Sequence, residues 1–105
     1  GWVNARTVKF NLDSSYNLKI PHMGWDTIKI KKESPLLNNI GSDCRFYFVH
    51  SYYVICEDEK DVLSTTTHGH DFVSSIQKNN IYATQFHPEK SHKYGLQLIR
   101  NFVNL

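Results

Sequence analysis

The sequence predicts an α/β domain, and three observations lead to this class. Residues 81–86 form a short, nearly continuous apolar run, which is typical of a buried central strand. A turn containing histidine, proline and glutamate follows at residues 87–89, and an amphipathic segment with helical spacing comes after it. Upstream segments alternate apolar and polar residues or are rich in β-branched and aromatic residues, which favours strands. Since α/β sheets place their sites beyond the carboxyl ends of strands, we expect the turn to carry the chemistry.

The composition fits one small domain. The chain has 105 residues, of which 40% are hydrophobic, and this is enough for a single core. Its formal net charge is only +2, and the basic residues are scattered along the chain. This charge pattern gives no support for binding to nucleic acid or to an acidic membrane surface.

The cysteines and the first residue suggest where such a chain works and what it is. Two cysteines are too few for a disulfide scaffold, and the sequence has no apolar run of 18 residues and no leader. We therefore expect a reduced, cytoplasmic protein. The chain starts with Gly1, so we interpret it as a piece of a longer protein or as a processed chain.

The first forty residues predict two strands and a turn. Residues 5–10 and 27–31 alternate in polarity, so each predicts a strand, the second with its lysines outward. Ser34 followed by proline begins a short helical turn that extends through Ile40, and Gly41 can end it.

The middle of the chain predicts further strands. Residues 45–56 are rich in aromatic and β-branched residues, which predicts one strand that continues into another with a bend near residues 50–51. Residues 62–68 and 71–77 predict a hairpin around the intervening His-Gly-His-Asp run.

The last segment predicts a helix. Ser91 is a plausible N-cap. Apolar residues then recur at three- and four-residue spacing, which predicts a single face directed into the core; its members are Leu96, Ile99, Phe102 and Val103.

His87 and Glu89 are the candidate chemical pair. Pro88 disfavours the helical region for the residue before it, so His87 is expected to be extended. Residues two apart in an extended chain project to the same side, so the carboxylate can accept a hydrogen bond from the imidazole. That bond fixes the tautomer and leaves the other ring nitrogen as a base. A plain surface turn remains the alternative on these residues alone.

The residues supply no obvious nucleophile for this base. Cys44 and Cys56 do not lie in a strand-turn-helix elbow with flanking glycines. Acidic neighbours of Cys56 favour a raised thiol pKa and a weaker nucleophile, so we interpret both cysteines as structural. His68 and His70 lack an evident third ligand, so we expect no metal site.

Three motifs resemble one known family. QFHPEKS at residues 85–91 resembles the C-terminal signature of the class I (triad) glutamine amidotransferases, and YFVHSY at residues 47–52 resembles their glutamine-pocket strand. PHMGW at residues 21–25 is narrower and resembles the glutaminase subunits of imidazole glycerol phosphate synthase, which supply ammonia in histidine biosynthesis. The resemblance implies a flavodoxin-like, three-layer α/β sandwich around a mixed sheet.

The resemblance also implies roles for individual residues. His87 would be the catalytic base, and Glu89 would orient it. Ser51 and Tyr52 would hold the substrate glutamine, chiefly through backbone groups. Three residues would lie toward a (β/α)8-barrel synthase that receives ammonia through a channel, namely Trp25, Lys90 and, near the hinge between the subunits, Tyr47. The family implies no cofactor.

The chain departs from the family pattern in two ways. It has no Gly-x-Cys-x-Gly elbow and no glycine-rich oxyanion strand, which in this family lie upstream. We therefore expect residues 1–105 to be the C-terminal part of one amidotransferase domain, inactive without the part that bears the nucleophile. Asp26 stands where the family usually has asparagine, which exchanges a donor for a carboxylate and leaves the choice of partner open.

Other functions stay open at this point. A paralogue could supply ammonia to a synthase of amino sugars for surface polysaccharides. A non-catalytic interaction module could keep the partner face without the chemistry, and a relative of the same fold could hydrolyse γ-glutamyl peptides.

Overall fold

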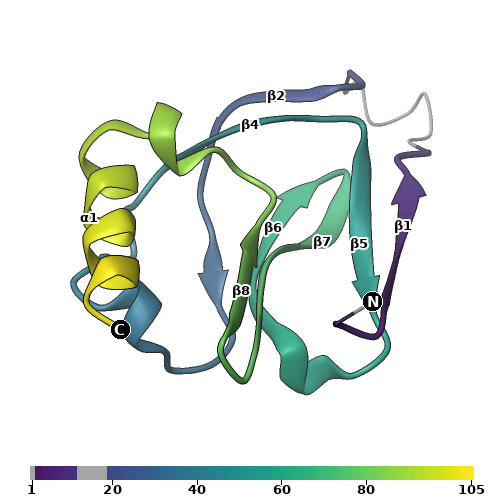
Figure 1. The fold of residues 1–105 in the computed structure, drawn as a ribbon. Coiled ribbons are helices and arrows are strands. Elements are labelled where there is room, and N and C mark those ends of the chain that lie inside the picture. Colours follow the sequence, from purple (N-terminus) through teal and green to yellow (C-terminus); the bar gives the residue numbers. More distant parts are fainter. Residues whose placement is uncertain (1, 12–18) are drawn as a thin grey trace.

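An antiparallel sheet and a two-stranded ribbon form the β-structure of the computed structural model, which describes residues 2–11 and 19–105 (Figure 1). Within these residues the sheet has the strand order β1-β5-β7-β6-β3, and β8 pairs with β7 beside β5. Its members are β1 (Ala5–Lys9), β3 (Lys29–Ile30), β5 (Tyr52–Cys56), β6 (Val62–His68), β7 (His70–Lys78) and β8 (Ile81–Thr84). The ribbon pairs β2 (His22–Asp26) with β4 (Phe46–His50).

The predicted bend in residues 45–56 is confirmed. β4 belongs to the ribbon and β5 to the main sheet, and Ser51 lies between them. Alternate residues of β4 are buried, namely Phe46, Phe48 and His50, so one face of this strand enters the core. The bend therefore carries the chain from one layer of strands to the other, which Figure 1 shows where β4 turns down into β5.

The predicted hairpin is also confirmed, with a tighter tip than expected. β6 and β7 are joined at Gly69, which has a φ of 80°, and His68 pairs with His70 across the turn. The strand predicted at residues 5–10 is confirmed as β1, which ends one residue earlier, at Lys9. The strand predicted at 27–31 shrinks to β3, because the Thr27 carbonyl accepts a hydrogen bond from the Thr66 hydroxyl at 2.9 Å.

Two short helical turns precede and follow the ribbon strand β4. The turn predicted to begin at Ser34 is η2 (Pro35–Leu37), and the Ser34 hydroxyl accepts a hydrogen bond from the Leu36 N–H. It ends before Gly41, because Asn39 takes a left-handed conformation with a φ of 63°. A second turn, η3 (Glu59–Asp61), joins β5 to β6.

The C-terminal helix α1 (His92–Val103) packs on the core with a different face from the predicted one. It buries Gly95 and Leu98, whereas Leu96, Ile99, Phe102 and Val103 are 52%, 40%, 55% and 74% exposed. The prediction was wrong because α1 has apolar residues on more than one side, and spacing alone does not show which side is covered. No helix in the described residues has the length and apolarity needed to span a membrane.

β8 differs from the predicted buried central strand. It pairs only with β7 among the described strands, and its residues are half-buried except for the exposed Ala83. An apolar run predicts burial on both faces, but β8 here presents a free edge. The packed centre of the domain consists instead of aromatic and aliphatic side chains from several elements, including Phe46, Phe48, Leu63, Phe72 and Phe86.

Candidate active site

His87 and Glu89 form a hydrogen-bonded pair immediately after β8. His87 is extended, with φ −100° and ψ 97°, and Pro88 begins the short turn η4 (Pro88–Lys90). The distance from His87 Nδ1 to Glu89 Oε1 is 2.8 Å. A carboxylate only accepts, so Nδ1–H donates, and in the neutral ring Nε2 is the basic nitrogen. The predicted geometry of this pair is therefore confirmed.

The charge of the pair follows from its contacts. The pKa of Glu89 is lowered, first by a hydrogen bond from its own backbone N–H and then by the bond from His87. The carboxyl group is therefore ionised at neutral pH and keeps the imidazole in one orientation. The His87 side chain is 37% exposed, so its basic nitrogen can meet a group from outside the described residues.

Ser91 fixes the turn against β4, a role that the sequence did not reveal. Its hydroxyl accepts from the Tyr47 N–H at 3.0 Å and donates to the His87 carbonyl at 2.6 Å. The His87 N–H in turn donates to the Tyr47 carbonyl at 2.9 Å. Ser91 does stand at the N-cap of α1, but its side chain makes no capping hydrogen bond. Its partner in β4 is 44 residues away in sequence, so no local pattern could have identified this contact.

Replacing Ser91 with alanine is expected to destabilise the protein by about 1–3 kcal/mol, because the partly buried Tyr47 N–H loses its acceptor. The free energy of unfolding of the full-length protein, measured with urea, checks this value. The matched control is Ser42→Ala at an exposed loop position, which is expected to change little. Equal effects of the two substitutions would show that the Ser91 bridge does not stabilise the turn.

Ser51 and Tyr52 lie at the other end of β4 from Tyr47. The Ser51 carbonyl accepts from the Phe10 N–H at 2.9 Å, and the Tyr52 carbonyl accepts from His50 Nδ1–H at 2.7 Å. In the described part of the chain, no hydrogen bond joins them to His87 or Glu89. β4 nevertheless links the two groups, since it contacts the His87 turn at Tyr47 and ends at the bend.

The residues predicted to face a partner gather beside the same turn. Trp25 pairs with Tyr47 across the ribbon, and their ring centroids are 6.0 Å apart. Trp25 is 45% exposed and stacks on the His92 ring at 5.3 Å. Lys90 is exposed at the end of η4, two residues before His92. The structure thus places Trp25 and Tyr47 beside the start of α1, and Lys90 in the turn that joins His87 to α1.

Both cysteines are poor nucleophiles where they stand. Burial raises the pKa of the Cys44 thiol, which is 1% exposed. Burial also raises the pKa of Cys56, and the charges of Asp61 and Asp58 raise it further. Thiolates are the reactive form, so neither cysteine is suited to attack a substrate at neutral pH. Among residues 2–11 and 19–105, no three His, Cys, Asp or Glu side chains are arranged to hold a metal ion.

Comparison with known proteins identifies relatives along the whole chain. The family model described as "Glutamine amidotransferase class-I" matches residues 4–105. A protein from Methanococcus maripaludis named "Imidazole glycerol phosphate synthase subunit HisH 2" is 53% identical over 103 residues, which cover 98% of this chain and 50% of the relative. The subunit HisH of Leptospira borgpetersenii is 51% identical over 106 residues, covering all of this chain and 52% of the relative.

A solved structure shares the fold. A Thermoplasma acidophilum protein described as a GMP synthase subunit superposes with a TM-score of 0.72 at 24% identity, covering 95% of this chain and 47% of that one. The chain spans about half the length of the curated relatives it matches. Because the family model covers nearly the whole chain and the relatives are about half identical to it, the chain belongs to the class I glutamine amidotransferases and has their flavodoxin-like α/β fold.

Proposed function

We propose that this chain is the base-bearing, C-terminal part of a glutaminase that hydrolyses glutamine to glutamate and ammonia. The ammonia passes to a synthase, and the best supported synthase is imidazole glycerol phosphate synthase of histidine biosynthesis. The observation that carries this proposal is the His87–Glu89 pair, held in one tautomer within a chain half identical to subunits named HisH.

The proposed chemistry is nucleophilic catalysis with His87 as acid and base. A cysteine thiolate from a segment outside these residues attacks the glutamine carboxamide carbon. The C–N bond then breaks, and His87 gives a proton to the departing ammonia. His87 next takes a proton from water, which hydrolyses the thioester to glutamate and releases the thiol. Glu89 keeps the imidazole oriented throughout, and backbone groups of Ser51 and Tyr52 hold the glutamine.

The proposed partner surface consists of Trp25, Tyr47 and Lys90, and its occupant is the (β/α)8-barrel synthase. Exposed aromatic residues are enriched at interfaces between proteins, and Trp25 and Tyr47 lie together on the ribbon. The Tyr47 carbonyl also accepts a backbone hydrogen bond from the His87 N–H, so the surface continues directly into the catalytic turn. Two free cysteines agree with a reducing, cytoplasmic setting for the complex.

The test uses the full-length protein together with its synthase partner. We expect glutamine to be converted to glutamate, with the amide nitrogen incorporated into the synthase product. An upstream sequence without a Gly-x-Cys-x-Gly elbow, together with no glutamate formed, would replace this proposal with the non-catalytic module. Incorporation of the nitrogen into an amino sugar would identify a different synthase.

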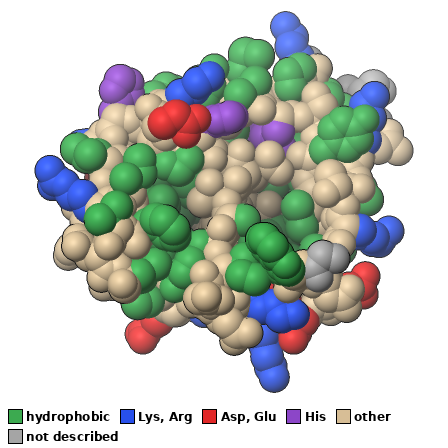
Figure 2. All heavy atoms as spheres, viewed as in Figure 1, with side chains coloured by type: hydrophobic (Ala, Val, Ile, Leu, Met, Phe, Trp, Pro, Cys, Tyr) green, Lys and Arg blue, Asp and Glu red, His purple; other side chains and the backbone are tan. Residues whose placement is uncertain are grey.

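The isolated 105-residue chain is expected to turn over no glutamine and to self-associate. Leu96, Ile99 and Phe102 are exposed on α1, and β8 has a free edge in the described sheet, features that favour association. Figure 2 shows hydrophobic side chains gathered on the side of the molecule that α1 occupies in Figure 1. Size-exclusion chromatography with light scattering and a glutamate assay check both expectations. Turnover that stops on alkylation of Cys44 or Cys56 would mean that this chain contains its own nucleophile.

A further inference from the structure

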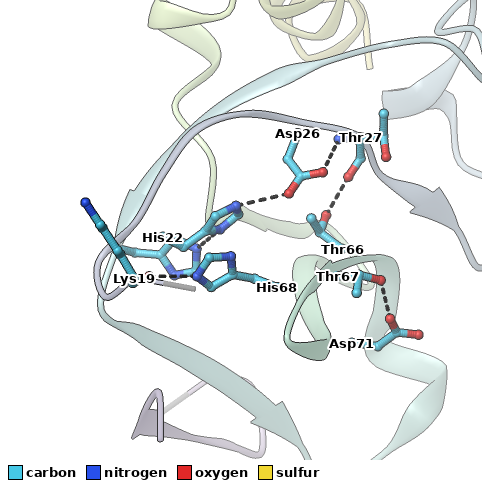
Figure 3. Close-up of polar contacts among 9 residues, drawn as sticks. Lys19, His22, Asp26, Thr27, Thr66, Thr67, His68 and Asp71 are labelled. Carbon is cyan, nitrogen blue, oxygen red and sulfur yellow. Dashed lines mark hydrogen bonds and ion pairs between the residues drawn. The ribbon is translucent and has the colours of Figure 1, made fainter. Parts of the chain in front are cut away.

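Two buried histidines join β2 to the bend before β5 through a chain of hydrogen bonds. His22 Nε2 is 3.1 Å from Asp26 Oδ2, and His22 Nδ1 is 2.9 Å from His50 Nε2. His50 Nδ1 is 2.7 Å from the Tyr52 carbonyl oxygen. His22 and His50 are 5% and 8% exposed, so water does not replace these bonds readily. Figure 3 shows the His22 ring between Asp26 and the neighbouring histidine rings.

The ends of this chain fix its number of protons. The Tyr52 carbonyl and an ionised Asp26 both only accept hydrogen bonds, and three bonds between them need three protons. Two neutral imidazoles supply only one N–H each. The chain therefore carries one proton more than two neutral rings and a carboxylate would hold. Without that proton, one of the three hydrogen bonds must be lost.

The surroundings place the additional proton on His22. Burial alone would raise the pKa of Asp26, but hydrogen bonds from His22 and from the Thr27 N–H outweigh it, and the pKa is lowered. Asp26 is therefore ionised. Burial lowers the pKa of His50. The hydrogen bond to the Tyr52 carbonyl opposes this shift, but the charges of His22, His68 and His87 add to the lowering, so His50 stays neutral.

The other groups packed against His22 suit a cation. The Phe48 ring stacks on His22 with a centroid distance of 4.9 Å, and an aromatic face attracts a positive charge. His68 of β6 also stacks on His22, at 4.2 Å, and its Nε2–H donates to the Lys19 carbonyl. The titratable groups that act on the His22–Asp26 pair and on its neighbour His50 are thus His68 from β6 and, for His50, also His87.

We propose that Asp26, His22 and His50 are positioning residues for the glutamine-holding bend, with a His22 imidazolium paired to the Asp26 carboxylate. His50 donates to the carbonyl of Tyr52 and so sets the conformation of the backbone at Ser51 and Tyr52. The effect on glutamine rests on the proposed function, whereas the proton count does not. None of the three side chains contacts the reacting atoms; they act through the bend.

The kinetic test compares substitutions at Asp26 in the full-length protein with its partner. Asp26→Leu leaves His22 without its anion and is expected to raise the KM for glutamine about three- to tenfold with kcat nearly unchanged. Asp26→Asn restores all three bonds in a neutral chain, because its amide N–H donates to His22 Nε2, so its KM is expected to match the wild type. Asp43→Leu, at an exposed loop position, is the matched control.

The dependence on pH separates positioning from a general loss of structure. The lowered pKa of Asp26 keeps the ion pair intact into mildly acidic solution, and its contribution is lost only as the pH falls through that lowered value. The asparagine of Asp26→Asn has no group that titrates at this position. The wild-type KM is therefore expected to rise only at acidic pH, as Asp26 takes up a proton, and the KM of Asp26→Asn to stay flat there. Identical pH profiles for the two proteins would overturn the proposal.

A spectroscopic measurement keeps the test independent of glutaminase activity. Nitrogen-15 chemical shifts of the His22 ring in the full-length protein are expected to show both nitrogens protonated in the wild type and only Nδ1 protonated in Asp26→Asn. A wild-type His22 with one protonated nitrogen would overturn the proposal even if glutamine is hydrolysed. If no glutamine is hydrolysed by any form, the proposed function fails, and these shifts still decide the proton count. If Asp26→Leu does not fold, the pH profile of the KM of Asp26→Asn and the nitrogen-15 shifts of His22 still test the proposal.

Discussion

Replacing His87 with alanine in the full-length protein is expected to lower glutamine hydrolysis by roughly two to four orders of magnitude. Nδ1 of this ring is bonded to Glu89 at 2.8 Å, so only Nε2 is free to move protons between water, thiol and departing ammonia. No other histidine is held in this way beside η4 in the described residues. His92, the nearest in sequence, stacks on Trp25. A coupled glutamate assay at saturating glutamine measures the loss in kcat.

Two further substitutions identify the cause of that loss. Glu89→Gln keeps an oxygen that accepts from Nδ1–H but removes the negative charge, so it is expected to be less harmful than His87→Ala. His70→Ala, which removes a half-buried histidine of the β6–β7 hairpin, serves as the histidine control. A rate for His87→Ala within about tenfold of the wild type would contradict the assignment of the base.

Local geometry explains what the sequence could predict about the site. Proline limits the residue before it, and residues two apart in an extended chain share a side, so the His87–Glu89 bond follows from three consecutive residues. The bend at Ser51 was predictable in the same way, because a long aromatic and β-branched run exceeds the length of one ordinary strand. The thiol pKa of Cys56 also moves in the predicted direction, although burial contributes more than its acidic neighbours.

Contacts between distant segments explain what the sequence could not predict. Ser91 looks like a capping residue in its local context, and only its contact with Tyr47 shows its actual role. His22 and His50 are 28 residues apart, and their hydrogen bond depends on the register of β2 against β4. β2 itself was missed as a strand, because Gly24, with a φ of 123°, interrupts its pattern.

Helix α1 shows a second reason why the sequence could not predict the structure. Two sides of α1 carry apolar residues, and the sequence pattern favoured the side with Leu96 and Ile99, whereas the structure buries the side with Gly95 and Leu98. A glycine adds nothing to a hydrophobic pattern, so the pattern could not show that Gly95 faces η4, where an added Cβ would collide with the Pro88 carbonyl. The backbone of α1 can approach the backbone of η4 this closely only because Gly95 has no side chain.

Replacing Gly95 with alanine is therefore expected to destabilise the protein by about 3 kcal/mol or more, whereas the same change inside an ordinary helix stabilises by about 0.5–1 kcal/mol. A Cβ at Gly95 would lie 1.8 Å from the Pro88 carbonyl oxygen and 3.0 Å from Ser91 Cβ. That carbonyl cannot move aside freely, because it accepts from the Ser91 N–H at 3.0 Å and belongs to η4. Either α1 separates from η4, or the turn that carries His87 shifts with it.

Both consequences can be measured in one variant. We expect the urea midpoint of Gly95→Ala to fall, and glutamine hydrolysis to fall further than the population of unfolded protein explains, because His87 is adjacent to the displaced Pro88. Lys93→Ala, at an exposed position of the same helix turn, is the matched control and is expected to preserve both. A wild-type urea midpoint for Gly95→Ala would mean that the added Cβ does not collide with the Pro88 carbonyl. In that case α1 does not pack on the turn this closely. Lost stability with a normal rate per folded molecule would instead show that the turn keeps its geometry without close packing of the helix, so that the Ser91 hydroxyl and the backbone bond from His87 to Tyr47 are sufficient to hold His87 against β4.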